Sequence, residues 1–543
     1  MNTETLREKL RLAPSTIEHV PTISRLANGS PRTVTGPRWV LLMFSVLSST
    51  FLFALDNTVV AAAQPHIVLH FQAVDRMAWL SVAFAAAALS TNLIFGQLYA
   101  CMPPKWLYIL SVVVFEAGSA LCGAAWDMTS LIVGRAVCGV GGIGMYVGVM
   151  ALLAAMTTVE ERPAYIGSIG MTWGLGTILG PVMGGAFTDS STWRWAFYIN
   201  LPFAAVILPA AVFILPAADP KAGCSPRARL AETDMIGGFL VLGATSTLVM
   251  AINFGGLLFD WNSAAEIALF SVSGALYLCL GCQQAFSLGT APQHRILCWD
   301  VLTAKESRRT VGLMILVTGA GGCGIFVPVY FIPLFFQFTR GDSAMDASLR
   351  LLPFIGVMIA TVVFQGVLLS RSRTILGLYM PWYAAGGCLT AVGGALMYLV
   401  DSGTPDASIY GFSVVLGAGV GMIGQAGFGV AQACVDKTQT AKAVALVALG
   451  QTGGITMALA VANTVFVHEA ARRLRGVLGS ALSEQEIHAA VGGVATEVFG
   501  QLPALESMTL PYIVIMAAGG ATAVLSVAMR RERIATSILA ISP

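Results

Sequence analysis

The stretch from residue 129 to residue 157 reads TSLIVGRAVCGVGGIGMYVGVMALLAAMT and holds one charged residue, Arg135. A bilayer core of about 30 Å is crossed by about 20 apolar helical residues, because a helix pairs its backbone polar groups internally. The whole chain has the same character. Of its 543 residues, 56% are apolar and 11% are charged, against about 25% charged in an ordinary globular protein. The sequence therefore predicts an all-α integral membrane protein.

Fourteen stretches of this kind are predicted to cross the membrane, grouped as six, two and six because long polar connections flank the seventh and eighth. The predicted spans lie near 39–63, 77–99, 106–125, 129–157, 165–187, 195–216, 235–256, 264–287, 311–337, 347–369, 375–400, 408–431, 441–467 and 510–529. Small residues recur at similar places in the first and last six spans, which weakly favours a duplicated six-helix unit.

The basic residues predict the orientation of the chain. With the polar first 38 residues in the cytosol, 22 of the 30 Lys and Arg residues fall on the cytosolic side and seven outside, as the positive-inside rule requires. Both termini are therefore expected in the cytosol. The predicted organisation is a cytosolic tail (1–38), an N-terminal six-helix bundle (39–216), cytosolic linkers with two extra spans (217–310), a C-terminal six-helix bundle (311–530) with an external loop (468–509), and a cytosolic tail (531–543).

Several classes of function are disfavoured by motifs. The chain contains no Gly-Lys dipeptide, so it has no phosphate-binding P-loop. Residues 139–144 match G-x-G-x-x-G, but they lie inside a span rather than in a turn after a strand. No H-E-x-x-H or G-x-S-x-G motif occurs, and neither a metal site, a cofactor nor an enzyme activity is expected. A net charge of +2 with scattered basic residues disfavours nucleic-acid binding.

Three charged residues lie well inside predicted spans: Asp56, Glu116 and Arg135. A charge at the bilayer centre costs at least about 2.5–3.5 kcal/mol, so each needs a reason. Asp56 could carry a proton reversibly or could be a structural carboxylate that never titrates. Arg135 stays protonated and could tune nearby carboxylates, bind a substrate acceptor or bond helix carbonyls. For Glu116, a hydrogen bond between helices is the alternative to a role in transport.

The fifth span carries Gly176, Gly180 and Gly184, which are four residues apart and share one helix face, with Pro181 among them. Small residues on one face allow close helix packing, and a proline inside a helix favours a kink. This span is predicted to be a packing seam, a bending seam between two states, or both. Polar residues in other spans could line a substrate cavity: Asn57, Gln337, Gln425 and Gln451.

Together these stretches resemble the major facilitator superfamily, in its fourteen-span drug–proton antiporter family, and most closely the fungal branch that exports toxins and secondary metabolites. The resemblance is carried by LDNTVVAAAQP (55–65), LIVGR (131–135), GTILGPVMGG (176–185), WRWAFYINLP (193–202), YFIPLFFQ (330–337), RGDSA (340–344) and RLLP (350–353). It implies the major facilitator fold, proton coupling at Asp56 and Arg135, and a conformational hinge that includes Gly185.

One motif departs from the family. The superfamily usually has an acidic and several basic residues after its second span, but here residues 96–105 read GQLYACMPPK, with Lys105 as the one charge. The usual charge latch between helix ends is therefore missing, which changes how the transporter would be gated rather than the family assignment.

The resemblance implies proton-coupled efflux, by alternating access, of a small and largely apolar molecule such as a toxin, drug or secondary metabolite. The expected partners are that substrate, protons and the lipid bilayer, with the proton gradient as the driving force and the monomer as the functional unit. The expected location is the plasma membrane, with the vacuolar membrane as an alternative. Other readings are an importer or vacuolar transporter of siderophores or basic amino acids and, more distantly, a receptor that does not transport.

Overall fold

A computed structural model describes residues 34–73, 76, 79–158, 161–217, 219, 223–255, 259–297, 299–303, 307–371, 377–435, 439–478 and 509–530. Nearly all regular structure in these ranges is helical, and an isolated bridge joins Gly255 to Phe259. Most of the predicted N-terminal tail, the C-terminal tail from residue 531, and residues 479–508 of the predicted external loop lie outside the described residues.

The described helices follow the predicted spans closely. The first group consists of α3 (Pro37–Phe71), α4 (Trp79–Cys101), α5 (Pro104–Gly123), α6 (Met128–Met156), α7 (Arg162–Ser190), α8 (Trp195–Tyr198) and α9 (Asn200–Ile214). The middle of the chain forms α10 (Pro226–Ala231), α11 (Met235–Phe254), α12 (Ala264–Phe286), the 3₁₀ turn η2 (Pro292–His294) and α13 (Trp299–Thr303). The last group consists of α14 (Arg308–Arg340), α15 (Ala344–Leu349), α16 (Leu352–Arg371), α17 (Met380–Tyr398), α18 (Asp406–Ile423), α19 (Ala426–Ala433), α20 (Thr440–Leu478) and α23 (Tyr512–Val527).

Twelve segments of the described chain are long and apolar enough to cross a membrane. The other two predicted spans, 375–400 and 510–529, are the helices α17 and α23, of 19 and 16 residues. These two helices pack closely through glycines: a Cβ on Gly387 would lie 2.5 Å from the Ala523 nitrogen, and one on Gly519 would lie 2.5 Å from the Ala391 nitrogen. The small residues of α17 lower its hydropathy, and α23 is shorter than the about 20 residues that a spanning helix needs. The exact number of fourteen spans therefore stays a prediction.

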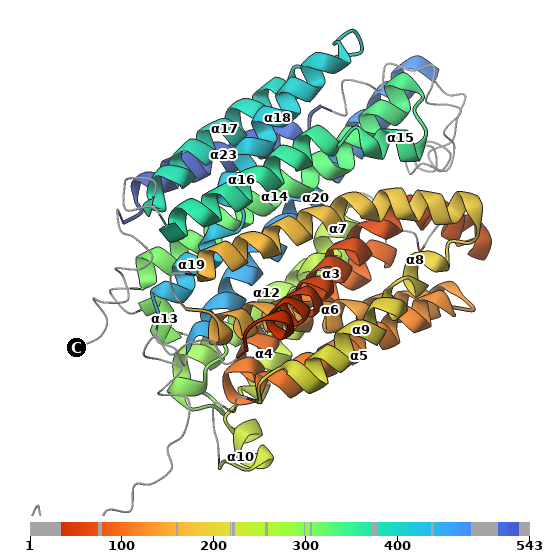
Figure 1. Ribbon diagram of the computed structural model, residues 1–543. Helices are drawn as coiled ribbons and strands as arrows, with labels where there is room; N and C mark the ends of the chain where they lie inside the picture. The colour runs from red at the N-terminus through yellow and green to blue at the C-terminus, as the bar shows by residue number, and fades with distance from the viewer. Residues whose placement is uncertain are drawn as a thin grey trace, which may run out of the picture.

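The helices lie side by side in two groups, α3–α9 and α14–α23 (Figure 1). The groups meet along two seams: α7 packs on α16, and α4 packs on α20. The extra helices α11 and α12 pack on each other, and α11 lies against α4. The interface between the two groups is therefore formed mainly by α4, α7, α16 and α20.

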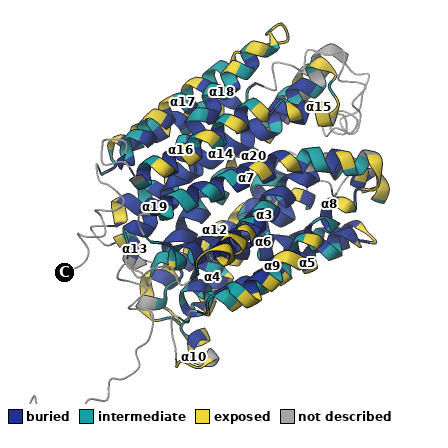
Figure 2. Cartoon of the chain, viewed as in Figure 1, coloured by how far each residue is buried: buried dark blue, intermediate teal, exposed yellow. Residues whose placement is uncertain are grey.

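Many large apolar side chains are exposed, and Figure 2 shows exposed residues, in yellow, along the outer helices. Phe213 is 84% exposed, and Phe239, Leu278 and Val527 are also strongly exposed. Exposed large apolar side chains on so many helices suit a lipid environment, in which the exterior of a spanning helix faces hydrocarbon. The chain is thus a helical, multi-pass integral membrane protein.

Three predicted boundaries differ from the structure. The predicted span 408–431 is divided into α18 and α19 at Gly424 and Gln425, where the φ of Gln425, −113°, departs from the value of about −63° in a regular α-helix. The predicted span 195–216 is divided at Ile199, just before a proline that has no N–H to donate. The predicted external loop 468–509 begins inside α20, which runs on to Leu478. The described part of that loop therefore continues a spanning helix.

Candidate functional site

Asp56 on α3 and Arg135 on α6 form a buried ion pair. Arg135 Nη1 lies 2.5 Å from Asp56 Oδ2, and the side chains are 1% and 0% exposed. The Asp127 carboxylate accepts a hydrogen bond from the Ser130 N–H and so caps the start of α6. The structure therefore brings together two of the three charges that were found inside the predicted spans.

Further contacts hold the Arg135 guanidinium in place. Its Nε donates to the Leu80 carbonyl of α4 at 3.1 Å, and its central carbon lies 4.4 Å from the centre of the Phe84 ring. On the other side, the Phe197 ring of α8 lies 5.9 Å away. Arg135 thus joins α3, α4 and α6 and contributes a fixed positive charge that does not itself transfer protons.

Asn200, the first residue of α9, is a member of this cluster that sequence reasoning missed. Its Nδ2 lies 3.4 Å from Asp56 Oδ1 and 3.0 Å from Ser119 Oγ on α5. The available signal was a single amide at the start of an otherwise apolar helix, in the motif that ends INLP. Asn200 therefore extends the cluster from the ion pair to α5.

Glu116, the third intramembrane charge, lies on α5 and is 7% exposed. Among the described residues, neither of its carboxylate oxygens has a hydrogen-bond partner. Within the described chain, the interhelical hydrogen bond that was one of its two predicted roles is therefore not formed. Glu116 is one helical turn before Ser119, so both side chains lie on the same face of α5.

The glycines of α7 differ in what surrounds them. A Cβ on Gly176 would lie 2.7 Å from the Phe51 carbonyl oxygen, and one on Gly180 would overlap the Thr58 side chain. Both contacts are on α3, and the residues contacted flank Asp56. Gly184 is buried, while a Cβ on Gly185 would have nothing within 4 Å. Pro181 lies inside α7, which continues past it to Ser190.

Tyr146 on α6 connects the two groups of helices near the middle of the molecule. Its hydroxyl donates to Gln451 Oε1 of α20 at 2.8 Å. Its ring centre lies 5.0 Å from that of Trp173 and 6.0 Å from that of Phe428, and Trp173 in turn faces Phe326. These side chains form an aromatic cluster that contains residues of both groups.

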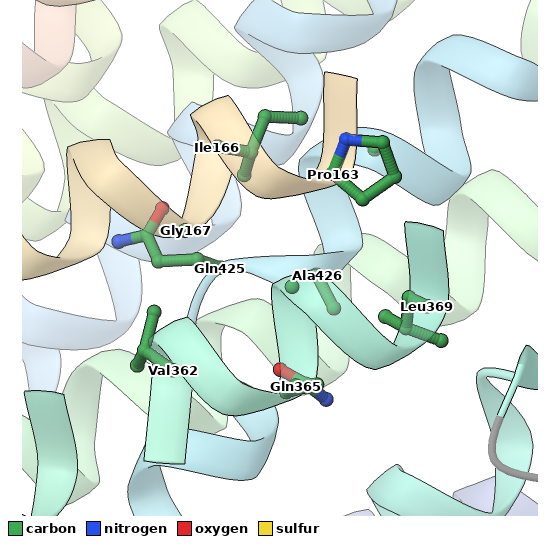
Figure 3. A pocket seen from close by; sticks show the side chains of 10 residues that line it. Pro163, Ile166, Gly167, Val362, Gln365, Leu369, Gln425 and Ala426 are labelled. Carbon is green, nitrogen blue, oxygen red and sulfur yellow. The ribbon is translucent and has the colours of Figure 1, made fainter. Parts of the chain in front are cut away.

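Gln425 lies at the break between α18 and α19 and lines a narrow crevice between α7 and α16 with a volume of about 10 Å³, room for about one water molecule (Figure 3). Gln425 is buried, and its Oε1 has no partner among the described residues. Asn57 and Gln337 are half-buried and do not line this crevice. Of the four predicted cavity residues, Gln425 and Gln451 thus lie where the two groups meet.

A polar network surrounds the end of α4 where the predicted charge latch is missing. The Asp234 N–H donates to Gln97 Oε1 at 3.1 Å, and Gln97 Nε2 donates to the His294 carbonyl at 2.5 Å. The buried Asp234 carboxylate also accepts from the side-chain amides of Gln283 and Gln284, at 3.0 and 2.6 Å. This network fastens α4 to α11, to α12 and to the segment before α13. We call this end of the molecule the linker side.

In the part of the chain that the structure describes, no group of three or more His, Cys, Asp and Glu side chains is arranged to hold a metal ion. The polar groups of the site are an ion pair, a second buried carboxyl group, and the Asn200 amide that joins Asp56 to α5.

Comparisons with known proteins agree with this architecture. Residues 46–459 match the sequence profile of the Major Facilitator Superfamily. The chain is 45% identical to the MFS-type transporter pgmG of Aspergillus terreus, over 87% of this chain and 83% of that protein. It is 41% identical to the phomenoic acid biosynthesis cluster MFS-type transporter of Leptosphaeria maculans, over 93% and 83%. It is 38% identical to the efflux pump alnA of Emericella nidulans, over 93% and 92%.

A solved structure shows the same fold. A bacterial homologue of the human lysosomal transporter Spinster, in an inward-facing and occupied conformation, superposes with a TM-score of 0.52. It is 14% identical, and the match covers 91% of this chain and 98% of that one.

Proposed function

The chain belongs to the major facilitator superfamily and is a membrane transporter rather than an enzyme, and we propose that it exports a small, largely apolar molecule in exchange for protons. The observation that carries the proton exchange is the buried cluster of Asp56, Arg135 and Glu116. Ionisable groups in a membrane interior are costly and are characteristic of ion and proton pathways. Relatives that are named efflux pumps support export as the direction.

The energy available is sufficient for concentrative export. One proton crossing about 100 mV supplies roughly 2.3 kcal/mol, and one pH unit adds about 1.4 kcal/mol. Exchanged one to one for a neutral substrate, this sustains a gradient of roughly 500-fold. No cofactor is needed for this mechanism.

The residues between the two groups of helices support an apolar substrate. Aromatic rings from both groups are available there, including Trp173, Phe326 and Phe428, with the amides of Gln425 and Gln451 beside them. Rings supply large apolar contact areas, and a few polar groups fix orientation. A secondary metabolite with a mainly hydrocarbon surface and one or two polar groups fits this chemistry.

The proposed setting is the plasma membrane, with both termini in the cytosol and the monomer as the working unit. The bias of Lys and Arg toward the tails and the 217–310 linkers supports this orientation. In this orientation the linker side is the cytosolic side, where the substrate enters.

The proposal is tested with inverted plasma-membrane vesicles from yeast that expresses the chain, using the uncharged apolar dye Nile red as the probe. With an acidic lumen, we expect uptake of the dye into the vesicles, lost when a protonophore collapses the gradient. Vesicles that carry an Arg135→Ala variant, present at the same level, are the control. Dye uptake that is equal with and without the proton gradient would contradict proton exchange. Proton-driven movement out of the vesicles would favour the importer.

A further inference from the structure

We propose that Glu116 is the side chain that binds and releases the exchanged proton, while Asp56 and Arg135 keep their charges as a permanent pair. The inference rests on the proton exchange proposed above and assigns the exchanged proton to the carboxyl group of one side chain. The sequence alone favours Asp56, because Asp56 lies in the more recognisable motif. The contacts of the three side chains favour Glu116.

The first reason is the difference in hydrogen bonding. Asp56 has a guanidinium on one oxygen and the Asn200 amide near the other. Its charge is therefore compensated without a proton. Glu116 is nearly as buried, yet both of its oxygens lack partners within the described residues. Burying an unpaired carboxylate costs far more than burying a neutral carboxyl group.

The second reason is the charge of the whole cluster. Asp56 and Arg135 cancel each other, so an ionised Glu116 would leave a net charge of −1 inside the bilayer. A protonated Glu116 leaves the cluster neutral. The closed arrangement of the helices therefore favours the protonated form, and loss of the proton is favoured when water or a hydrogen-bond donor reaches the carboxyl group. Opening of the bundle provides that change, which couples proton release to conformation.

The third reason is placement. Glu116 lies on the α5 face that carries Ser119, and Asn200 joins Ser119 to Asp56. The helix is also held very close to α6: a Cβ on Gly118 would lie 2.6 Å from the Cys138 nitrogen. The backbone that carries Glu116 therefore cannot move away from α6 without separating the two helices. The carboxyl group thus stays near the pair, where a change in its charge affects the cluster.

The helices that pack against α5 carry few charged groups. In the described chain the titratable groups on these helices are Tyr99 and Cys101 on α4, Arg135, Cys138 and Tyr146 on α6, Tyr198 on α8, and Lys105, Tyr108 and Cys122 on α5 itself, while α9 carries none. Asp56 on α3 is joined to α5 through Asn200. Tyr198 lies against Gly123, two turns further along α5. Of the charged members, Lys105 at the start of α5 donates to the Val212 and Leu215 carbonyls, while Asp56 and Arg135 compensate each other. Glu116 is left as the group whose proton occupancy changes the charge of the site.

The proton is located by labelling with N,N′-dicyclohexylcarbodiimide. A protonated carboxyl group adds across one C=N bond of this reagent, and the adduct rearranges to a stable N-acylurea with no leaving group. We expect mass spectrometry of the purified, reconstituted protein to find the adduct on Glu116. Above the pH at which the acid is half ionised, labelling should fall about tenfold for each pH unit. Labelling of Asp56 in place of Glu116 would overturn the inference.

Transport of Nile red in the vesicle assay supplies the second measurement. We expect Glu116→Gln to abolish the proton-driven component of Nile red uptake. Glu116→Asp, which keeps a carboxyl group at this position, should retain it. The matched control is Glu266→Gln, which changes another buried carboxyl group, on α12 away from the ion pair, and should leave the coupling unchanged. Full coupling in folded Glu116→Gln would refute the inference and leave the proposed function standing. Labelled Glu116 without proton-dependent uptake in the wild type would instead refute the proposed function.

Discussion

At the scale of single residues, the Asp56–Arg135 pair determines how its neighbours are charged. A buried ion pair is costly to form, but removing one partner costs more because the other charge is left unpaired. Arg135 would lose its carboxylate and keep the Leu80 carbonyl and two aromatic rings. These contacts cannot neutralise a full charge.

We therefore expect Asp56→Asn to destabilise the protein by about 3–5 kcal/mol. The double variant Asp56→Asn/Arg135→Gln should recover much of this loss, since no isolated charge remains. The measurement is thermal unfolding of the detergent-solubilised variants, followed by the reaction of buried cysteines with a thiol dye. A double variant no more stable than Asp56→Asn would show that the interaction between the two charges does not contribute to the stability of the protein.

The sequence was sufficient to find Asp56, Glu116 and Arg135, because a charge in an apolar span stands out on composition alone. It was not sufficient to find Asn200. Many Asn and Gln residues occur in the spans, and the Asn200–Asp56 contact joins residues 144 apart in the chain. Which oxygen of which carboxylate is satisfied also depends on the packing of several helices. The distinction between Asp56 and Glu116 came from these contacts.

At the scale of helices, α7 shows how spacing in the sequence becomes packing. The four-residue spacing of the glycines predicted one close-packed face, and Gly176 and Gly180 do lie against α3. The glycine spacing did not predict that α3 would be the helix packed against this face, since the packing partner depends on the arrangement of the whole bundle. Nor could it show that Gly185, within the same motif, has open space around it.

This difference gives a matched pair of substitutions. Gly180→Ala should destabilise the protein by about 1–3 kcal/mol, because the new methyl group overlaps Thr58 next to the ion pair. Gly185→Ala should change stability by less than about 0.5 kcal/mol. Both are measured by thermal unfolding, alongside uptake of Nile red. Equal effects of the two substitutions would mean that the motif acts through helix flexibility rather than through contact with α3.

At the scale of the whole molecule, the described structure is closed on the linker side. Gly96 of α4 lies against Ala445 of α20, and Pro163 of α7 lies against Gly366 of α16. Close contacts thus occur at this end of both seams between the two groups of helices. Opening this end requires both seams to separate, as alternating access demands.

A larger side chain in one seam should hold it open. Ala445→Trp is expected to shift the population toward a state open on the linker side. The buried thiol of Cys101, at the end of α4, should then react several times faster with a membrane-impermeant maleimide, measured peptide by peptide. Val461→Trp on the outer, exposed face of the same helix is the control. Unchanged reactivity of Cys101 in a folded Ala445→Trp protein would show that the seam does not control access.

The network around Gln97 has a consequence for the middle of the chain. Where relatives of this superfamily usually fasten the second helix with charges of its own loop, this protein uses an amide on α4, a carboxylate at the start of α11 and a backbone carbonyl at His294. Through Asp234, Gln283, Gln284 and His294, the described part of the 217–310 insert thereby holds the end of α4 as well as connecting the two halves. Shortening this insert or exchanging it for a flexible tether would alter the rate at which the transporter cycles, even with every residue of both bundles intact.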